Sequence, residues 1–252
     1  MTELPSILRQ IVATKHQEVA LLHQQDHPPA LSQPRHKRFV NALSPVGVIA
    51  EVKRASPSRG IIRTDFDPVV IARSYQQGGA VALSVLTDQV YFMGHADYIP
   101  PIRSACSLPI LRKEFIIDRA QLDETVRLGA DAVLLIAGIL SDTQLHDLHA
   151  HAHSLGLDVL VEVHTADELD RVLGIPGVDL IGINNRDLHT FTVDLSVTLT
   201  LRPRIPHGIK VVAESGYRDP NDIQVLREHA IDAVLIGESL ADDQVSRQLL
   251  RS

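Results

Sequence analysis

The chain has 252 residues, 44% hydrophobic and 22% charged, a composition typical of a globular protein. Its net charge of −7, the lack of a long basic block and the content of four tyrosines, five phenylalanines and no tryptophan argue against a nucleic-acid partner. With no apolar run of about 18 residues, no signal-like N-terminus and a single cysteine, Cys106, we expect a cytoplasmic protein that neither crosses a membrane nor forms an internal disulfide.

Residues 1–45 are predicted to be a helical extension packed on the rest of one domain that spans residues 1–252. Apolar residues recur at helical spacing over residues 4–22, with Pro5 in the first turn. The stretch 27–34 holds too many prolines to continue that helix. The basic cluster at residues 35–38 (RHKR) is expected to be either a solvated surface or the mouth of an anion site near the substrate.

From residue 46 onwards a repeating pattern of short apolar runs predicts eight strands. The runs lie at residues 46–52, 80–86, 108–111, 132–137, 159–163, 180–183, 209–213 and 233–236. Segments of helical period lie between them at 68–77, 119–128, 141–155, 166–173 and 220–229, several of them ending at glycine. Strands without a polar face indicate a parallel sheet covered by helices. Eight such units predict a (β/α)8 TIM barrel, and a doubly wound open sheet is the weaker alternative because no G-x-G-x-x-G follows the first strand.

Polar residues gather where the predicted strands end, which is where a barrel of this kind carries its chemistry. Glu51 and Lys53 stand at alternate positions of the first strand and therefore point to the same side. Taken alone, they predict either a salt bridge at a strand end or a polar cavity. Comparable strand ends carry Thr87 and Asp88, Lys113 and Glu114, Glu162 and His164, Asn184 to Asp187, Glu214 and Ser215, and Glu238. Their convergence on one rim predicts a functional site.

The last two strands are followed by glycine-bearing turns, Ser215-Gly216 and Gly237-Glu238. In a TIM barrel the loops after strands 7 and 8 commonly hold a phosphate group through backbone N–H groups. Glycine allows the backbone to approach the anion closely. The sequence therefore predicts a phosphorylated small-molecule substrate.

Five stretches of the chain resemble the motifs of the indole-3-glycerol-phosphate synthase family, and the resemblance spans essentially the whole chain. They are residues 50–60 (AEVKRASPSRG), 82–88 (ALSVLTD), 111–118 (LRKEFIID), 182–188 (GINNRDL) and 213–216 (AESG). The resemblance implies a TIM-barrel enzyme of tryptophan biosynthesis. It would convert 1-(2-carboxyphenylamino)-1-deoxyribulose 5-phosphate into indole-3-glycerol phosphate, CO2 and water, without a metal or an organic cofactor. One departure is that residues 93–95 (MGH) replace the expected Gly-Ser before the second helix of the barrel.

The motif positions imply which residues form the site. The resemblance implies catalytic roles for Glu51, Lys53, Lys113, Glu162, Asn184, Glu214 and Ser215. It implies that the phosphate is bound by Ser56, Gly216 and Gly237 and that Arg186 contacts the anthranilate side. We further predict that the backbone amide of Glu238 binds the phosphate. Because a carboxylate and a phosphate repel each other, the Glu238 carboxylate is expected to turn towards solvent or a basic neighbour.

The chemistry of ring closure suggests how the roles divide. Lys113 is a cationic acid suited to protonate the ribulose carbonyl oxygen. Loss of water needs a second proton donor, either Glu162 or Lys53 paired with Glu51. We favour Glu162 as the acid/base partner and Glu51 as the group that holds Lys53. Asn184, Glu214 and Ser215 are then expected to position the substrate and the charged groups.

Three other readings of the sequence are weaker. A sugar-phosphate isomerase of related fold would need an Asp/Cys pair at the strand ends, but Cys106 precedes the third strand, at the opposite end of the barrel. A catalytically silent phosphate-binding barrel would have lost Lys113 or Glu162. The histidines at positions 146, 149 and 153 share a helix face that could bind a metal, but we expect a solvated polar face and no metal site. The sequence is compatible with a monomer.

Overall fold

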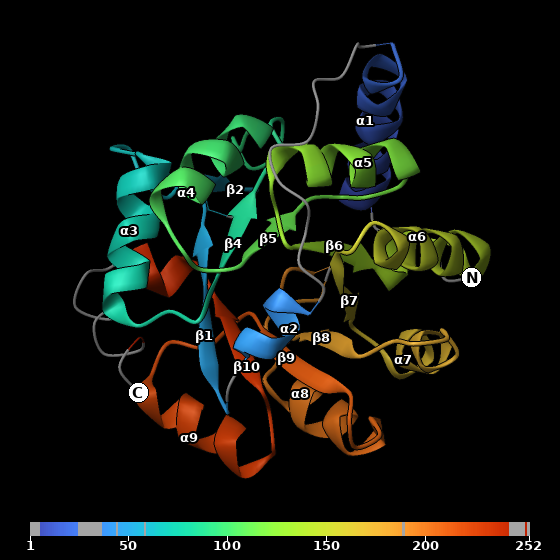
Figure 1. Ribbon diagram of the computed structural model, residues 1–252. Coiled ribbons are helices and arrows are strands. Elements are labelled where there is room, and N and C mark those ends of the chain that lie inside the picture. The colour runs from blue at the N-terminus through green and yellow to red at the C-terminus, as the bar shows by residue number, and fades with distance from the viewer. Residues whose placement is uncertain are drawn as a thin grey trace.

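The computed structural model describes residues 6–24, 37–43, 45–57, 59–187, 190–241 and 250, and its central feature is a closed barrel of eight parallel strands (Figure 1). The strands are β1 (Gly47–Val52), β4 (Ala82–Leu86), β5 (Ile110–Lys113), β6 (Ala132–Ile136), β7 (Asp158–Val163), β8 (Leu180–Asn184), β9 (Lys210–Glu214) and β10 (Ala233–Ile236). β1 pairs with both β4 and β10, which closes the sheet. The predicted TIM barrel is confirmed, and the open-sheet alternative is wrong.

Helices connect consecutive strands and cover the outside of the barrel (Figure 1). The α-helices of this layer are α3 (Pro68–Gly78), α4 (Ile99–Ala105), α5 (Arg119–Leu128), α6 (Asp142–Ser154), α7 (Ala166–Leu173), α8 (Ser196–Leu201) and α9 (Pro220–Glu228). Short 3-10 turns are η1 (Ala96–Tyr98), η2 (Ala137–Ile139), η3 (Arg202–Arg204) and η4 (Glu238–Ala241), and a small hairpin pairs β2 (Ala55–Ser56) with β3 (Gly60–Ile61).

The sequence explains where several of these helices begin and end. The side chains of Asp67, Asp118 and Thr165 each accept a hydrogen bond from a backbone N–H in the first turn of α3, α5 and α7. Gly79 and Gly129 follow α3 and α5 with φ of +109° and +86°, a left-handed conformation in which glycine is unstrained. Every residue of β4 and β6 is buried, because one face lines the barrel and the other contacts the helices.

The N-terminal ends of the strands are closed by the short helix α2 (Arg38–Ala42), which the sequence did not indicate. Phe39 is fully buried there, and the carboxylate of Asp158 at the start of β7 accepts the backbone N–H groups of Lys37, Phe39 and Val40. The Arg38 guanidinium pairs with Asp131, the residue that precedes β6. α2 therefore acts as a plug at the end of the barrel where the strands begin.

This placement corrects one expectation about the basic cluster at residues 35–38. Lys37 and Arg38 lie beside the carboxylates that precede or begin strands, at the end of the barrel opposite the strand ends that carry the predicted site. The prediction that they line the mouth of an anion site is therefore wrong. Arg35 and His36, like the proline-rich stretch 27–34, lie outside the described residues.

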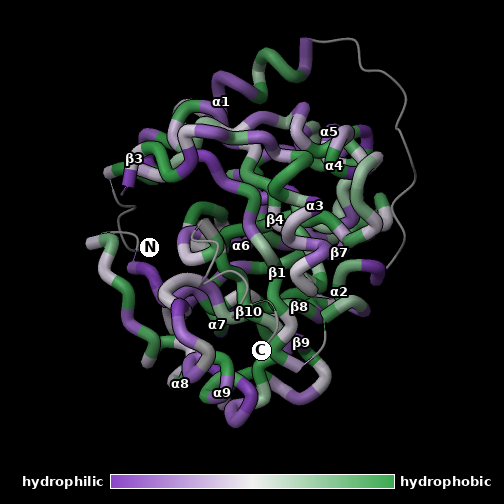
Figure 2. Tube along the Cα trace, turned by 90° about the vertical axis from the view of Figure 1, so that its left-hand side faces the viewer, coloured by the Kyte–Doolittle hydropathy of each residue, from purple (hydrophilic) through white to green (hydrophobic). Residues whose placement is uncertain are grey.

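The helix α1 (Ser6–Leu22) matches the predicted first helix, whose residues 4 and 5 are not among the described ones. Figure 2 shows hydrophobic and hydrophilic residues alternating along α1. One side of the helix buries Leu8 and Ile11 together with Lys15, whose Nζ lies 2.7 Å from Asp88 and 2.9 Å from Glu114 at the strand ends of β4 and β5. Among the helices that the structure describes, none has both the length and the apolar character needed to span a bilayer.

Candidate active site

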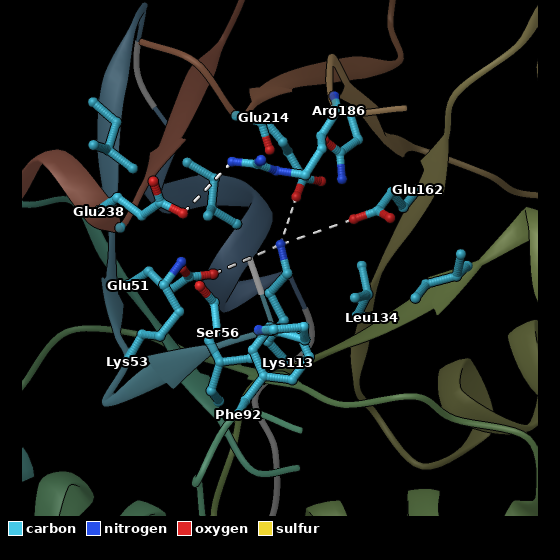
Figure 3. Close-up of a pocket in the computed structure, with 18 of the residues that line it drawn as sticks. Glu51, Lys53, Ser56, Phe92, Lys113, Leu134, Glu162, Arg186, Glu214 and Glu238 are labelled. Carbon is cyan, nitrogen blue, oxygen red and sulfur yellow. Dashed lines mark hydrogen bonds and ion pairs between the residues drawn. The ribbon is translucent and has the colours of Figure 1, made fainter. Parts of the chain in front are cut away.

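A pocket opens at the C-terminal ends of the strands, and it contains all of the site residues predicted from the sequence (Figure 3). Those residues are Glu51, Lys53, Ser56, Lys113, Glu162, Asn184, Arg186, Glu214, Ser215, Gly216, Gly237 and Glu238. They come from the ends of β1, β5, β7, β8, β9 and β10 and from the turns that follow these strands. Closure of the barrel is what brings these distant segments together.

Lys113, the last residue of β5, lies among three carboxylates (Figure 3). Its Nζ is 2.7 Å from Glu214 Oε2 and 3.8 Å from both Glu51 Oε1 and Glu162 Oε2. Burial opposes a charge on this amine, but the carboxylates of Glu214, Glu51 and Glu162 outweigh that effect and raise the pKa of Lys113 above its usual value. The resting site therefore holds a permanent cation at its centre.

Glu51 and Lys53 point to the same side of β1 and form an ion pair, as their alternate positions predicted. Burial opposes ionisation of Glu51, but Lys53, Lys113 and Arg186 together lower its pKa below the usual value. Gly237 borders this pair, and a Cβ there would overlap the Glu51 carboxylate. Gly237 thus leaves room for the Glu51–Lys53 pair, a function that the sequence pattern did not suggest.

Glu214 ends β9 and is the most deeply buried acid of the site, at 1% exposure. Burial and the neighbouring Glu162 raise the pKa of Glu214 to about 7, against the lowering effect of Lys113. Its Oε1 atom has no hydrogen-bond partner among the described residues. Gly182 on β8 makes space for this carboxylate, because a Cβ at that position would overlap Glu214 Oε1. The motif containing Gly182 was recognised, but this function of the glycine was not.

The turn after β9 has an unusual backbone. Ser215 has φ +65° and Gly216 has φ +96°, so two successive residues adopt left-handed conformations. Asn185, to which the sequence analysis gave no individual role, holds the turn: its Nδ2 donates to the backbone oxygens of Glu214 and Ser215 and to the Tyr217 hydroxyl. Asn185 therefore stabilises the loop without facing the pocket, since its side chain is buried in these contacts.

The Glu238 carboxylate lies between two guanidinium groups. Its Oε2 is 3.3 Å from Arg59 Nε, and its Oε1 is 3.6 Å from Arg186 Nη2. Arg186 is held further by the bond from its backbone N–H to Asn184 Oδ1 and from its Nη1 to the Phe191 carbonyl oxygen. The carboxylate thus faces basic neighbours, the second of the two orientations expected from the sequence.

One wall of the pocket is apolar, and most of it escaped the sequence analysis. Phe92 and Phe115 lie with their ring centroids 6.0 Å apart, and Leu134 on β6 lies nearby. Ile7, Leu8 and Ile11 of α1 complete this wall. The only signal in the sequence was the apolar face of the first helix, which had to cover some other surface. An apolar wall next to charged groups suits a ligand with an aromatic ring and an anionic end.

Other polar residues at the strand ends are engaged in contacts with each other and with the helices, although Glu114 also borders the pocket. Arg112 points away from the barrel axis and pairs with Glu124 on α5. Glu114 and Asp88 are engaged by Lys15, and Thr87 Oγ1 donates to Glu114. Successive strand residues point to opposite faces, so Arg112 and Lys113 serve different purposes.

The histidine-rich helix α6 and the cysteine lie away from the pocket. His149 is only 2% exposed and contacts the ring of His153 in a tilted arrangement with 4.5 Å between ring centroids, so the expectation of a solvated face is wrong for His149. The reason is that α6 turns this residue towards the barrel between Leu145 and Ala152, which are also buried. No group of three potential metal ligands occurs within the described ranges.

Cys106 is buried ahead of β5, at the opposite end of the barrel from the pocket as predicted.

Comparison with known proteins gives consistent results along the chain. A family model described as indole-3-glycerol phosphate synthase matches residues 7–252. The protein of that name from Geobacillus kaustophilus is 48% identical, over 97% of this chain and 96% of the relative. That from Bordetella pertussis is also 48% identical, over 92% of this chain and 93% of the relative. An N-acetylmannosamine-6-phosphate 2-epimerase structure from Clostridium perfringens matches 87% of this chain and 98% of that chain, with a TM-score of 0.63. Its 15% identity indicates a shared fold alone.

Proposed function

Since this chain belongs to the indole-3-glycerol phosphate synthase family, we propose that the charged groups around Lys113 carry out that family's reaction. The chain catalyses a carboxy-lyase reaction of tryptophan biosynthesis, in which 1-(2-carboxyphenylamino)-1-deoxyribulose 5-phosphate closes to indole-3-glycerol phosphate with loss of CO2 and water. The substrate's carboxylate leaves as neutral CO2, so one proton is taken from solvent in each turnover. The site must therefore supply, accept and replace protons in sequence.

The position of Lys113 among Glu51, Glu162 and Glu214 is the observation that supports the first step. When the anthranilate ring carbon attacks the ribulose carbonyl, negative charge develops on the carbonyl oxygen. A preorganised ammonium group stabilises this charge best in a site that excludes water. The raised pKa of Lys113 keeps the amine charged before reaction. As the C–C bond forms, the oxygen becomes a strongly basic alkoxide and takes the proton from Lys113.

The later steps need a second acid/base group. Loss of CO2 restores the aromatic ring. Loss of water then places a proton on the departing hydroxide and removes one from the substrate. We assign this exchange to Glu162, whose Oε2 lies 3.8 Å from Lys113 Nζ. The alternative donor is Lys53, which we propose is held in place by its ion pair with Glu51.

The remaining residues are assigned to substrate positioning. We assign the phosphate to Ser56 and to the backbone N–H groups of Gly216, Gly237 and Glu238, next to the left-handed turn at Ser215. We assign Arg186 to the anthranilate side of the substrate, in the pocket that Phe92 and Phe115 also line. Asn184, Glu214 and Ser215 hold the substrate and Lys113 in reacting geometry.

The proposal extends to the organisation of the chain. We propose that residues 1–252 act as one domain, in which residues 1–45 are an extension carried on the barrel. The contacts of Lys15 with Asp88 and Glu114 and of Arg38 with Asp131 support this view, because they tie the extension to both ends of the barrel. A monomer in the cytoplasm is the simplest working form, and the single free cysteine suits a reducing compartment.

Turnover of the carboxyphenylamino-deoxyribulose phosphate, followed by the fluorescence of the indole product, tests these assignments. Glu162→Gln keeps the shape of the side chain and removes the acid, so kcat should fall by about 10²–10⁴ while KM changes little. Asp147→Asn, at an exposed ion pair with Arg119 on the outer helices, is the control and should keep the parent rate. A kcat within a few-fold of the parent would reduce Glu162 to a positional role. Lys53→Gln would then test the alternative donor.

A further inference from the structure

His164 lies directly behind Glu162 at the end of β7. Its Nε2 is 3.3 Å from Glu162 Oε1, while Lys113 Nζ is 3.8 Å from the other oxygen, Oε2. The two atoms of the His164–Glu162 contact are close but lack hydrogen-bond geometry, so the imidazole acts on Glu162 mainly through its charge. The His164 side chain is only 9% exposed, which leaves little solvent to screen that charge.

The imidazole is held in this orientation by Glu168. The Oε2 atom of Glu168 accepts the backbone N–H of His164 at 2.6 Å and lies 3.3 Å from its Nδ1. Glu168 sits in the first turn of α7, where its own N–H donates to the side chain of the N-cap residue Thr165. Gly138 in η2 borders the Glu168 carboxylate, and a Cβ there would approach Oε1 to 2.9 Å. Contacts with α7 and with η2 therefore hold Glu168 in place. Because Glu168 in turn holds the imidazole, these contacts also fix the orientation of His164 towards Glu162.

The surroundings of His164 favour the charged imidazole. Three carboxylates face it from three elements: Glu162 on β7, Glu168 on α7 and Glu214 on β9. Burial disfavours the charge, but the hydrogen bond to Glu168 and the charges of Glu162, Glu168 and Glu214 raise the pKa of His164 above its usual value. The same contact lowers the pKa of Glu168 despite its burial. The surroundings thus favour a cation next to the proposed acid/base group.

A second cation beside Glu162 matters because Glu162 and Glu214 share one buried cavity, where two like charges are costly. Lys113 alone would favour an ionised Glu214, since Nζ is 2.7 Å from Glu214 and 3.8 Å from Glu162. The proton would then rest on Glu162. An imidazolium at 3.3 Å from Glu162 opposes this preference.

We propose that His164, held by Glu168, is a positioning residue that keeps Glu162 ionised in the resting enzyme, so that the proton shared by the buried carboxylates rests on Glu214. This inference rests on the acid/base role proposed for Glu162. Glu162 then begins the cycle as a base: it accepts the proton that the substrate releases as the indole ring forms and passes this proton to the departing hydroxide, so that it is ionised again once water has left. The proton on Glu214 can reload Lys113 across their 2.7 Å contact after Lys113 has protonated the substrate.

The test is the pH dependence of kcat/KM in His164→Gln, which replaces the cation with a neutral amide. We expect the acid limb of the profile to move upwards by about one pH unit or more, because Glu162 loses the charge that stabilised its ionised form. Glu168→Gln should move the limb in the same direction by less. His151→Gln is the matched control: His151 pairs with Asp123 at 3.2 Å on the outer helices, so its loss should leave the profile unchanged.

A double-mutant cycle shows whether His164 acts through Glu162. In a Glu162→Gln background, His164→Gln should cause little further loss of kcat. If His164→Gln lowered kcat as much in the Glu162→Gln background as in the parent, the proposal would be overturned. It would also be overturned if the acid limb of the single variant His164→Gln lay within about 0.3 pH units of the parent. Glu162→Gln alone tests the proposed function, so near-parental turnover in that variant would overturn the acid/base role separately.

A measurement on the unsubstituted protein covers the case in which His164→Gln does not fold. Histidine-labelled protein, titrated by NMR, should contain an imidazole next to Glu162 that stays charged to above the usual histidine pKa of about 6.5. A His164 resonance that becomes neutral below that value would overturn the proposal regardless of the kinetics.

Discussion

The two ends of the barrel both bury charged side chains, but they treat them differently. At the N-terminal end, the Asp131 carboxylate accepts bonds from Arg38, from Arg103 and from the backbone N–H of Ile110, at 2.6 to 2.8 Å. At the C-terminal end, Lys113 is surrounded by three carboxylates, and one oxygen of Glu214 lacks a hydrogen-bond partner within the described part of the chain. The first arrangement is saturated with donors, and the second has an excess of acids.

The contrast shows how buried charged groups that stabilise the fold of this molecule differ from those that are suited to a reaction. A buried carboxylate whose two oxygens both accept hydrogen bonds, as those of Asp131 do, contributes to closure of the barrel and has little capacity left for a ligand. A cluster with surplus acids and a shared proton is costly in the empty protein and suits proton transfer. Substitutions at the first end should therefore change stability with little effect on kcat, and substitutions at the second should do the opposite.

The largest expected effect is at the reactive end. Lys113→Ala should lower kcat by about 10²–10⁴, because the cation that protonates the carbonyl oxygen is lost. The urea midpoint should change much less, since the site's acids can take up protons in its absence. Product fluorescence and urea unfolding measure the two quantities. If the variant kept a near-parental kcat, Lys113 would not be the general acid, and the proposed difference between the two ends would lose its main support.

The corresponding change at the saturated end is Asp131→Ala. It leaves two guanidinium groups and the Ile110 N–H without their acceptor, which should lower the free energy of unfolding by about 3 kcal/mol. The kcat of the folded fraction should remain that of the parent. Asp147→Ala, which removes an exposed pair with Arg119, should change the free energy of unfolding much less and serves as the control. A kcat loss as large as the stability loss would contradict the division.

The acid sensitivity of stability should trace in part to His149, which belongs to neither end. Burial lowers the pKa of His149 to about 4, so the folded protein binds this proton less readily than the unfolded chain does. The stability that depends on a neutral His149 is complete above the unfolded pKa of about 6.5 and is lost as pH falls towards 4.

In His149→Leu, the difference in unfolding free energy between pH 7 and pH 4 should shrink by up to about 3 kcal/mol. Urea unfolding at several pH values measures this slope. The matched substitution at the exposed His146, His146→Leu, should leave the slope as it is in the parent. Equal slopes for His149→Leu and the parent would place the acid sensitivity elsewhere, for instance in the carboxylates of the reactive end.

A smaller effect on the reactive end is expected from a steric change at Gly182, a residue that takes no part in the chemistry. In Gly182→Ala the new methyl group overlaps Glu214 Oε1 and displaces the carboxylate that holds Lys113. A displacement of about 1 Å at such a site costs about 10² in rate. Single-turnover measurements at saturating substrate should show the loss in kcat. Gly177→Ala, where added atoms would meet open space, controls for the loss of a glycine, although its φ of +79° brings some strain.

The smallest effect is expected for Glu238→Ser. If the phosphate is held by backbone N–H groups, the side chain at this position matters little and KM should stay within a few-fold of the parent. The carboxylate lies 3.3 Å from Arg59 and 3.6 Å from Arg186, contacts too long for strong ion pairs, so their loss should have a modest effect on stability. A KM raised more than tenfold would mean that the arginines need Glu238 to be placed for the substrate.

Much of this molecule could be predicted from the sequence because the relevant information is local and repeated. The eight apolar runs and their glycine-ended helices indicated the barrel, and predicted ranges such as 119–128 and 233–236 coincide with α5 and β10. The alternation of Glu51 and Lys53 within one strand indicated that both face the same side. Polar residues at the predicted strand ends, together with the recognised motifs, were enough to indicate the residues that meet in one pocket. These features depend on backbone periodicity and on the rule that parallel strands end at one rim.

Other features were decided only by tertiary packing, since they depend on which surfaces meet. Arg38 lies at the saturated end because Asp131 and Ser107, far away in sequence, converge there. Gly182 is needed because the neighbouring strand points Glu214 at it. His149 is buried and His146 exposed on the same helix, although a run of histidines carries no signal of which one faces the barrel. A sequence pattern determines to which face of its own helix or strand a side chain points. The charge state of that side chain and the room available to it are set by neighbours from other elements.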